Sequence, residues 1–335
     1  MLAKLHAVEA DKKDHAMRRR HLPLLATPLL LPGAARAQAF PDRPIRIIVP
    51  FPPGGSNDIV ARVLQPRLQE ALGRPVVVDN RGGASGSVGA GEAARAAPDG
   101  ATWVLVNDTL ANNDTLMQLP YRLDAFSFAS VVGTCPYAFV TQRAAPWADW
   151  AAVAAQAKAR PDSLQYATTG TGSLAHIATT LLAREGGFGL THVPYRGGGP
   201  ALQDVLAGHV PLFMSNIVII MPHLRSGALR ALGVTSPEPS RFLPGVPTFR
   251  QIGFNGFDAL TWWAMVGPAG IPAPLVQRMS EAVRTATQDA GVKARLDELG
   301  AEIVANTPAQ AEAFIKAEAT RWGRVIREAN IQAEG

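Results

Sequence analysis

Four short segments rich in glycine, serine and threonine carry the groups that could bind a ligand. Each follows a strand-like stretch and precedes a helix-like one. Glycine lets the backbone approach a ligand closely, and the N–H groups at a helix start attract an anion. Serine and threonine add neutral hydroxyl donors, so the set predicts a carboxylate site built from neutral dipoles. The segments are Phe51–Asp58, Arg81–Gly91, Thr168–Ser173 and Tyr195–Pro200.

The third segment also contains a G-x-G-x-x-A pattern, Gly170–Ala175, which is typical of dinucleotide-binding turns. Arg196, at the end of the next strand-like stretch, could then contact the 2′-phosphate of NADP. An NADP-dependent oxidoreductase is therefore an alternative, although the pattern lies in mid-chain and no catalytic partner accompanies it. The GxxxxGK[ST] pattern of a phosphate-binding loop does not occur.

Patterns typical of hydrolases and metal sites do not occur in the sequence. There is no G-x-S-x-G motif, and Ser173 and His176 fall within one turn of a single predicted helix. That spacing is a poor geometry for a nucleophile and its base. The histidines lack a metal-ligand spacing such as H-E-x-x-H. We therefore expect a protein that is not an enzyme and that uses no cofactor and no metal.

The elements that must position these segments alternate between strand and helix. Strands at residues 45–51, 75–80 and 101–108, with helical segments between them, form a βαβαβ unit typical of a parallel sheet. The regularity lapses for about twenty residues after Leu110, and a second α/β unit spans residues 147–236. Residues 127–142 and 260–270 are predicted crossovers between the units. Two helices, at 274–299 and 308–330, end the chain.

These elements predict an α/β fold with two domains, each a mixed, mostly parallel sheet flanked by helices. Domain 1 would comprise residues 40–139 and 259–335, and domain 2 residues 140–258. Ligands of such folds bind beyond the carboxyl ends of the strands. We therefore expect the four segments to face one another across a cleft between the domains.

Residues 1–39 have the pattern of a secretory signal peptide. Basic residues after Met17 precede an apolar stretch, Leu22–Leu31, and Ala37-Gln38-Ala39 forms a cleavage site before Phe40. Translation could start at Met17, and Arg19-Arg20 leaves both the general and the twin-arginine export routes open. This region carries seven basic and three acidic residues of a chain whose net charge is +5. The remainder is almost neutral, so nucleic-acid binding is not expected.

Cys135 is the only cysteine, so the chain cannot form an intramolecular disulfide. It lies in the apolar run FASVVGTCPYAFV, which predicts a buried thiol of small-hydrophobe character. No segment after residue 40 is long and apolar enough to predict a membrane span.

Several of these segments, taken in order, resemble one protein family. They are PDRPIRIIVPFPPGGSNDIVAR, VVVDNRGGASGSVGAGEAARAAPDG, YATTGTGSLAH, THVPYRGGGPALQDVLAGHV and LRALGVTS. Together they resemble the Bug family, the periplasmic solute-binding receptors of tripartite tricarboxylate transporters. The resemblance implies a two-domain Venus-flytrap fold of the type II periplasmic binding protein class. It also implies a monomer that binds a small carboxylic acid and docks on integral membrane transporter subunits.

The resemblance implies ligand-binding residues in the loop after the first strand and in the facing loops of the second domain, and the expected site adds further residues to these. The expected site in the first domain comprises Phe51, Pro53, Gly54, Gly55, Ser56, Asp58, Ala84, Ser85 and Asp108. The expected site in the second domain comprises Thr169, Gly170, Thr171, Gly172, Ser173, His176, Tyr195, Arg196, Ser215 and Asn216. We expect Asp58 to stabilise the start of its helix rather than to repel the ligand.

One position departs from the family pattern. Relatives commonly carry Phe-Asp-Asn where this chain reads Met214-Ser215-Asn216. Where the family uses that carboxylate to bind a ligand amine, this chain cannot do so. We therefore expect a plain carboxylic acid as ligand, whose identity the sequence does not specify. An exported sensor that presents its ligand to a signalling partner is a further alternative, because it would need the same fold.

Overall fold

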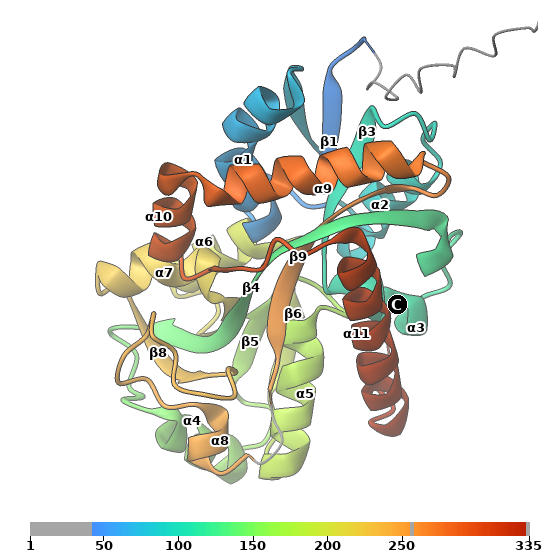
Figure 1. Cartoon of the computed structure of the whole chain (residues 1–335). Helices are drawn as coiled ribbons and strands as arrows, with labels where there is room; N and C mark the ends of the chain where they lie inside the picture. Colours follow the sequence, from blue (N-terminus) through green and yellow to red (C-terminus); the bar gives the residue numbers. More distant parts are fainter. Residues whose placement is uncertain (1–41, 255–257, 333–335) are drawn as a thin grey trace, which may run out of the picture. The chain divides into compact units, whose positions relative to one another are not determined.

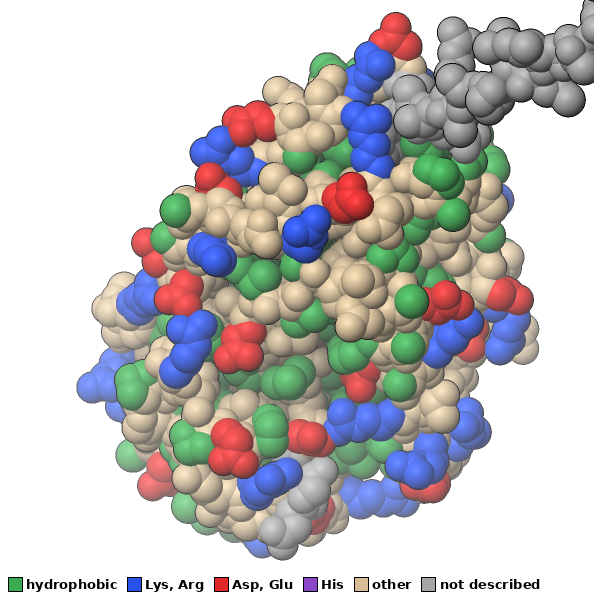
Figure 2. Space-filling model, viewed as in Figure 1, with side chains coloured by type: hydrophobic (Ala, Val, Ile, Leu, Met, Phe, Trp, Pro, Cys, Tyr) green, Lys and Arg blue, Asp and Glu red, His purple; other side chains and the backbone are tan. Residues whose placement is uncertain are grey.

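The computed structural model of the 335-residue chain describes residues 42–254 and 258–332. The predicted signal peptide lies outside these ranges. Within the described residues, no helix is both long and apolar enough to cross a membrane. Acidic and basic side chains are interspersed over the face shown in Figure 2.

The strands and helices form two lobes that share one long strand, β4 (Figure 1). The first lobe contains β1 (Ile45–Val49), α1 (Ser56–Leu72), β2 (Val76–Asn80), η1 (Ala84–Gly86), α2 (Ser87–Ala94), β3 (Thr102–Asn107), α3 (Thr109–Leu116), η2 (Leu123–Ala125), β9 (Leu260–Pro268), α9 (Ala273–Gln288), α10 (Ala290–Glu298), β10 (Glu302–Ile303) and α11 (Pro308–Glu328).

The second lobe follows β4 (Phe126–Gln142) along the chain. It contains α4 (Trp150–Ala159), β5 (Gln165–Thr168), α5 (Leu174–Gly186), β6 (Thr191–Pro194), α6 (Gly198–Ala207), β7 (Leu212–Asn216), α7 (Ile217–Arg225), β8 (Leu229–Val234) and α8 (Phe249–Ile252).

The strands pair in the order β2-β1-β3-β9-β4-β7-β5-β6, with β8 and β10 also bonded to β4. Strands β2, β1 and β3 are parallel, and so are β6, β5 and β7. The two parallel groups are joined through β9 and β4, which run antiparallel to their neighbours. The first part of β4 pairs with β9, and its last residues pair with β7 and β8. The predicted crossovers are therefore the strands that connect the lobes.

Local sequence explains how the first lobe starts. Strand β1 is an apolar run whose side chains are almost all buried. Helix α1 begins after Gly55, and Gly73 ends it in the left-handed conformation with φ 65°. The βαβαβ pattern predicted from the sequence is confirmed. The exact domain boundaries, at 139/140 and 258/259, stay a prediction.

Two helical regions differ from expectation. The irregular segment after Leu110 contains α3, whose sequence TLANNDTL has no strong helix pattern. The single helix expected over 274–299 is two helices, α9 and α10, that meet at Asp289. The Asp289 side chain accepts a 3.0 Å hydrogen bond from the Val292 N–H and so caps α10.

Candidate ligand-binding site

A cavity of about 330 Å³ lies where loops of the two lobes meet. The first lobe contributes residues that follow β1, β2 and α3, and the second lobe contributes residues that follow β5 and β6. The lining residues are Phe51, Gly83, Ala84, Ser85, Gly86, Met117, Thr169, Gly170, Thr171, Pro194, Tyr195 and Arg196. The predicted loops therefore meet at one place, at the carboxyl ends of parallel strands.

The loop after β1 is held together by Asp58, near the start of α1. The Asp58 carboxylate accepts a 3.0 Å hydrogen bond from the Gly54 N–H and a 2.9 Å bond from Arg62. Burial acts to raise the pKa of Asp58, but these bonds and one from Asn80 outweigh it, and the pKa is lowered. Asp58 therefore holds the loop in place as an anion, and it is not among the residues that line the cavity.

The two glycines of this loop have backbone partners inside the loop. The Gly54 N–H donates to Asp58, and the Gly55 N–H donates to the Pro52 carbonyl at 3.4 Å. Neither group is a free donor in this arrangement, so a ligand would have to compete with these bonds. The predicted role of Gly54 and Gly55 as ligand donors stays a prediction.

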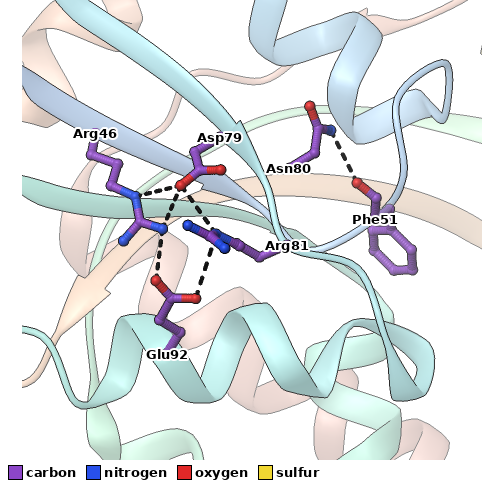
Figure 3. Close-up of polar contacts among 6 residues, drawn as sticks. All are labelled: Arg46, Phe51, Asp79, Asn80, Arg81 and Glu92. Carbon is purple, nitrogen blue, oxygen red and sulfur yellow. Dashed lines mark hydrogen bonds and ion pairs between the residues drawn. The ribbon is translucent and has the colours of Figure 1, made fainter.

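A cluster of charged residues lies at the base of the second loop (Figure 3). Asp79 and Glu92 both pair with Arg46, and Arg81 lies 3.2 Å from Asp79. The cluster joins β1, β2 and α2 just before the Gly82-Gly83 turn. Beside it, Asn80 donates a 3.0 Å hydrogen bond to the Phe51 carbonyl (Figure 3). The first and second loops are thus fixed to each other as well as to the sheet.

The second loop adopts an unusual backbone where it lines the cavity. Ala84 and Ser85 have φ values of 42° and 50°, in the left-handed region that side-chain-bearing residues seldom occupy. Such local strain is typical of functional sites. The Ser85 hydroxyl donates a 2.6 Å hydrogen bond to the Thr171 carbonyl of the second lobe. The Asn113 side chain in turn donates to the Ser85 carbonyl at 3.0 Å.

The third loop connects β5 to α5 and brings backbone groups to the cavity. Gly170 requires φ 134°, and a Cβ there would lie 2.9 Å from the Ser85 hydroxyl, so glycine fits best. Ser173 caps α5 by accepting from the His176 N–H at 3.3 Å. The Thr171 N–H donates to no atom of the described residues. That group is available to an anion.

Two histidine rings support this loop. His176 and His192 stack with ring centroids 4.2 Å apart, and His192 lies 2.7 Å from the Thr168 hydroxyl. Burial and, to a smaller extent, charge repulsion from His176 together lower the pKa of His192 to about 3. Neither ring lines the cavity. The Gly172 N–H donates a 3.4 Å hydrogen bond to His176 Nδ1, so His176 supports the loop in this arrangement.

The fourth loop supplies the only charged side chain among the cavity-lining residues, Arg196. Arg196 is exposed, and within the described residues it forms no ion pair. Tyr195 is fixed by a 2.6 Å bond from its hydroxyl to Asp204, and burial raises its pKa to about 12. The cavity therefore combines one cation with neutral donors and has no carboxylate in its lining.

Eight of the predicted residues line the cavity: Phe51, Ala84, Ser85, Thr169, Gly170, Thr171, Tyr195 and Arg196. Others lie in the same loops or in the first turn of the helix that follows, without lining the cavity: Pro53, Gly54, Gly55, Ser56, Asp58, Gly172, Ser173 and His176. Sequence reasoning did not single out Gly83, Gly86, Met117 and Pro194. Gly83 and Gly86 lie within the predicted second segment, whereas no motif marks Met117.

Three predicted residues are buried between the lobes. Asn216 donates a 3.1 Å hydrogen bond to the Ser56 hydroxyl, which links β7 to α1. Ser215 is fully buried, and its hydroxyl donates to the Asn216 carbonyl. Asp108 is 1% exposed, and its two oxygens accept hydrogen bonds from the Tyr137 hydroxyl and the Leu174 N–H. In this arrangement Asn216 and Asp108 bond across the lobes, whereas Ser215 bonds to its neighbour in β7. None of the three lines the cavity.

Two lobes connected by extended strands, with a cavity between their loops, define the two-domain, Venus-flytrap class of periplasmic binding proteins. Residues 60–331 match the model of the tripartite tricarboxylate transporter family receptors. The chain belongs to this family.

Relatives and solved structures agree with this assignment. The chain is 39% identical over 296 residues to protein BugT of Bordetella pertussis, covering 87% of this chain and 91% of that protein. The structure of periplasmic binding protein BugD superposes with a TM-score of 0.84 at 30% identity, covering 88% of this chain and all of BugD.

Two neighbours were solved with acids bound. MatC from Rhodopseudomonas palustris, with malate, has a TM-score of 0.81 at 32% identity and covers 86% of this chain and all of MatC. R. palustris Rpa4515, with adipate, has a TM-score of 0.84 at 29% identity and covers 88% of this chain and 99% of that protein. The family model describes receptors, and BugD is a periplasmic binding protein.

Proposed function

We propose that this protein is a periplasmic receptor that captures a small carboxylic acid between its lobes and delivers it to a membrane transporter. The observation that carries the proposal is the cavity itself, with Arg196, hydroxyl donors and the free Thr171 N–H but no acidic lining residue. A carboxylate would gain charge-assisted hydrogen bonds there without repulsion from the lining.

The size of the cavity favours a small ligand. Its volume of about 330 Å³ is at the lower end of small-molecule sites, which span roughly 300–1,000 Å³. Phe51, Met117 and Tyr195 offer apolar surface to the carbon skeleton of the acid. The neighbours bound to malate and adipate support an acid of that size.

The ligand is proposed to lack a cationic amine. The cavity lining contains no carboxylate that could pair with an ammonium group. The position where relatives carry aspartate is Ser215, whose hydroxyl bonds to the Asn216 carbonyl. Amino acids such as aspartate and glutamate would therefore leave a buried charge without a partner.

Closure explains how binding is signalled without a chemical step. A ligand that touches both lobes stabilises the closed arrangement through contacts that the open arrangement lacks. The closed receptor then presents a distinct surface to the transporter subunits. Export through a cleaved signal peptide before Phe40 would place the protein in the periplasm, where this transfer takes place.

A thermal-shift panel tests the proposal. Mono-, di- and tricarboxylic acids and aromatic acids would be compared with their neutral amides, with aspartate and glutamate, and with NADP. A ligand at about 100 times its Kd adds about 2.7 kcal/mol of stability, which raises the Tm by several degrees. We expect at least one acid to do so while its amide does not. A response to NADP alone would refute the proposal, and a preference for aspartate or glutamate would refute the amine-free ligand.

A further inference from the structure

Asp108 lies at the centre of the junction between the lobes. It directly follows β3 and precedes α3. Its side chain is 1% exposed and does not line the cavity. Strands β4 and β9 pass beside it, and the first turn of α5 faces it. A buried carboxylate persists in a folded protein only when donors satisfy it.

Three elements donate to this carboxylate. Oδ1 accepts from the Tyr137 hydroxyl of β4 at 3.1 Å and from the Thr261 hydroxyl of β9 at 2.5 Å. Oδ2 accepts from the Leu174 N–H, the first residue of α5, at 3.3 Å. Asp108 therefore contacts both strands that connect the lobes and one helix that belongs to the second lobe.

The bond to α5 depends on the arrangement of the lobes. Helix α5 follows directly on Gly170–Ser173, the loop that reaches the cavity. A hinge motion that opened the cavity would carry α5 away from β3 and break the bond between Asp108 and Leu174. The Leu174 N–H, at the start of α5, has no acceptor within the helix, so the Asp108 oxygen satisfies it when the lobes are together.

We propose that Asp108 is an inter-lobe latch, a positioning residue that holds the start of α5 against the connecting strands and thereby favours the closed arrangement. The proposal deepens, and rests on, the proposed function of ligand capture by closure. Asp108 would act on affinity through the position of the third loop and not by touching the ligand.

The latch makes closure sensitive to pH. Burial raises the pKa of Asp108 to about 6, although Thr261, Leu174 and Tyr137 donate to the ionised form. Tyr137 and Cys135 of β4 are titratable groups that interact with Asp108, and burial raises the pKa of both, so they stay neutral. Opening would hydrate Asp108 and lower its pKa towards the ordinary value. The closed form therefore binds a proton more readily, and acidification from about pH 7 to about pH 5 favours closure.

Spin labels test the latch without any ligand. Labels at Gln277→Cys in the first lobe and Ala151→Cys in the second would report the inter-lobe distance by pulsed EPR, because both positions are exposed and Cys135 is buried. In wild type we expect a larger short-distance population at pH 5 than at pH 7.5. Asp108→Asn should remove this pH dependence. A pH dependence that Asp108→Asn leaves intact would overturn the proposal.

Affinity provides the second readout, with adipate or the best acid of the panel as the probe. Asp108→Ala should weaken binding by about tenfold or more, because it leaves three buried donors without their acceptor. The matched control is Asp114→Asn on α3, the helix that follows Asp108, since Asp114 forms an ion pair with the exposed Arg122 at 3.2 Å. If no acid binds, the proposed function fails while the EPR comparison still decides the latch. The latch would be refuted if wild type and Asp108→Ala had equal affinity for the acid and equal inter-lobe distances by EPR.

Discussion

The Ser85 hydroxyl lies 2.6 Å from the Thr171 carbonyl and donates a hydrogen bond to it across the cavity. The two residues belong to different lobes, and both line the cavity. This bond and the bond from Asn216 to Ser56 join the loops of the two lobes directly. The structure is therefore a closed arrangement, in which the cavity is bounded from both sides.

Ser85→Ala should weaken ligand binding by roughly five- to tenfold, because closure loses one inter-lobe hydrogen bond worth about 1 kcal/mol. The Tm of the ligand-free protein should change little, since Ser85 is partly exposed. Isothermal titration with the best acid of the panel measures the effect. Ser87→Ala is the matched control, because Ser87 lies two residues away and outside the cavity lining. Equal losses in both variants would contradict the role of Ser85.

Arg196→Gln should weaken binding of an acid by at least tenfold, because it removes the cation of the cavity lining. The loss should be greater for a dicarboxylate than for the corresponding monocarboxylate if Arg196 contacts a second carboxylate. Arg250→Gln, an exposed arginine of α8 outside the cavity, serves as control. An unchanged Kd for Arg196→Gln would show that the ligand binds without it.

Asp58→Asn should lower the free energy of unfolding at pH 7 by about 1.5–3 kcal/mol, since it weakens charge-assisted bonds to Gly54 and Arg62. The pKa of Asp58 is lowered in the folded protein, so the ionised carboxylate contributes stability above its ordinary pKa of about 3.9. That contribution is lost as the pH falls through the folded pKa. Urea unfolding at pH 7 and pH 3.5 should therefore show a gap between wild type and variant that narrows in acid. Greatly tightened ligand binding with undiminished stability would refute the structural role of Asp58.

Cys135 should react slowly with a thiol reagent in the native protein. Its side chain is 1% exposed, and burial raises its pKa, which keeps the thiol protonated. Reaction with Ellman's reagent in buffer should be much slower than in denaturing urea. Rapid reaction of the native protein would mean that the junction between β4 and β9 opens readily.

Much of the fold follows from local pattern. The apolar run Ile45–Val49, followed by Pro-Pro-Gly-Gly and an amphipathic helix, predicts β1 and α1 where the structure has them. The long apolar runs at 127–142 and 260–270 predict the two connecting strands. Helix α3 could not be predicted, because Asn and Asp are poor helix formers and tertiary packing against α11 stabilises it.

Site residues that lie in short sequence motifs can be predicted, whereas those placed by tertiary packing cannot. Glycine-rich turns after parallel strands mark the loops that carry Ser85, Gly170 and Arg196. Met117 reaches the cavity because α3 ends beside it, and no sequence motif predicts the end of this helix. Conversely, Asp108 looks like a polar residue at a strand end, yet β4, β9 and α5 enclose it. Enclosure depends on elements that are distant in sequence, so the sequence predicts the residue type but not its role.

Isothermal titration of the ligand-freed protein with adipate and with adipamide tests whether the cavity binds carboxylates. Unfolding and refolding before the titration would remove any acid retained from the cell. The two compounds share a carbon skeleton and differ in charge, so the comparison isolates the anionic groups. We expect the diacid, or another acid identified by the panel, to bind in a one-to-one complex and the matched amide to bind at least a hundredfold more weakly. Equal binding of acid and amide would contradict a carboxylate receptor.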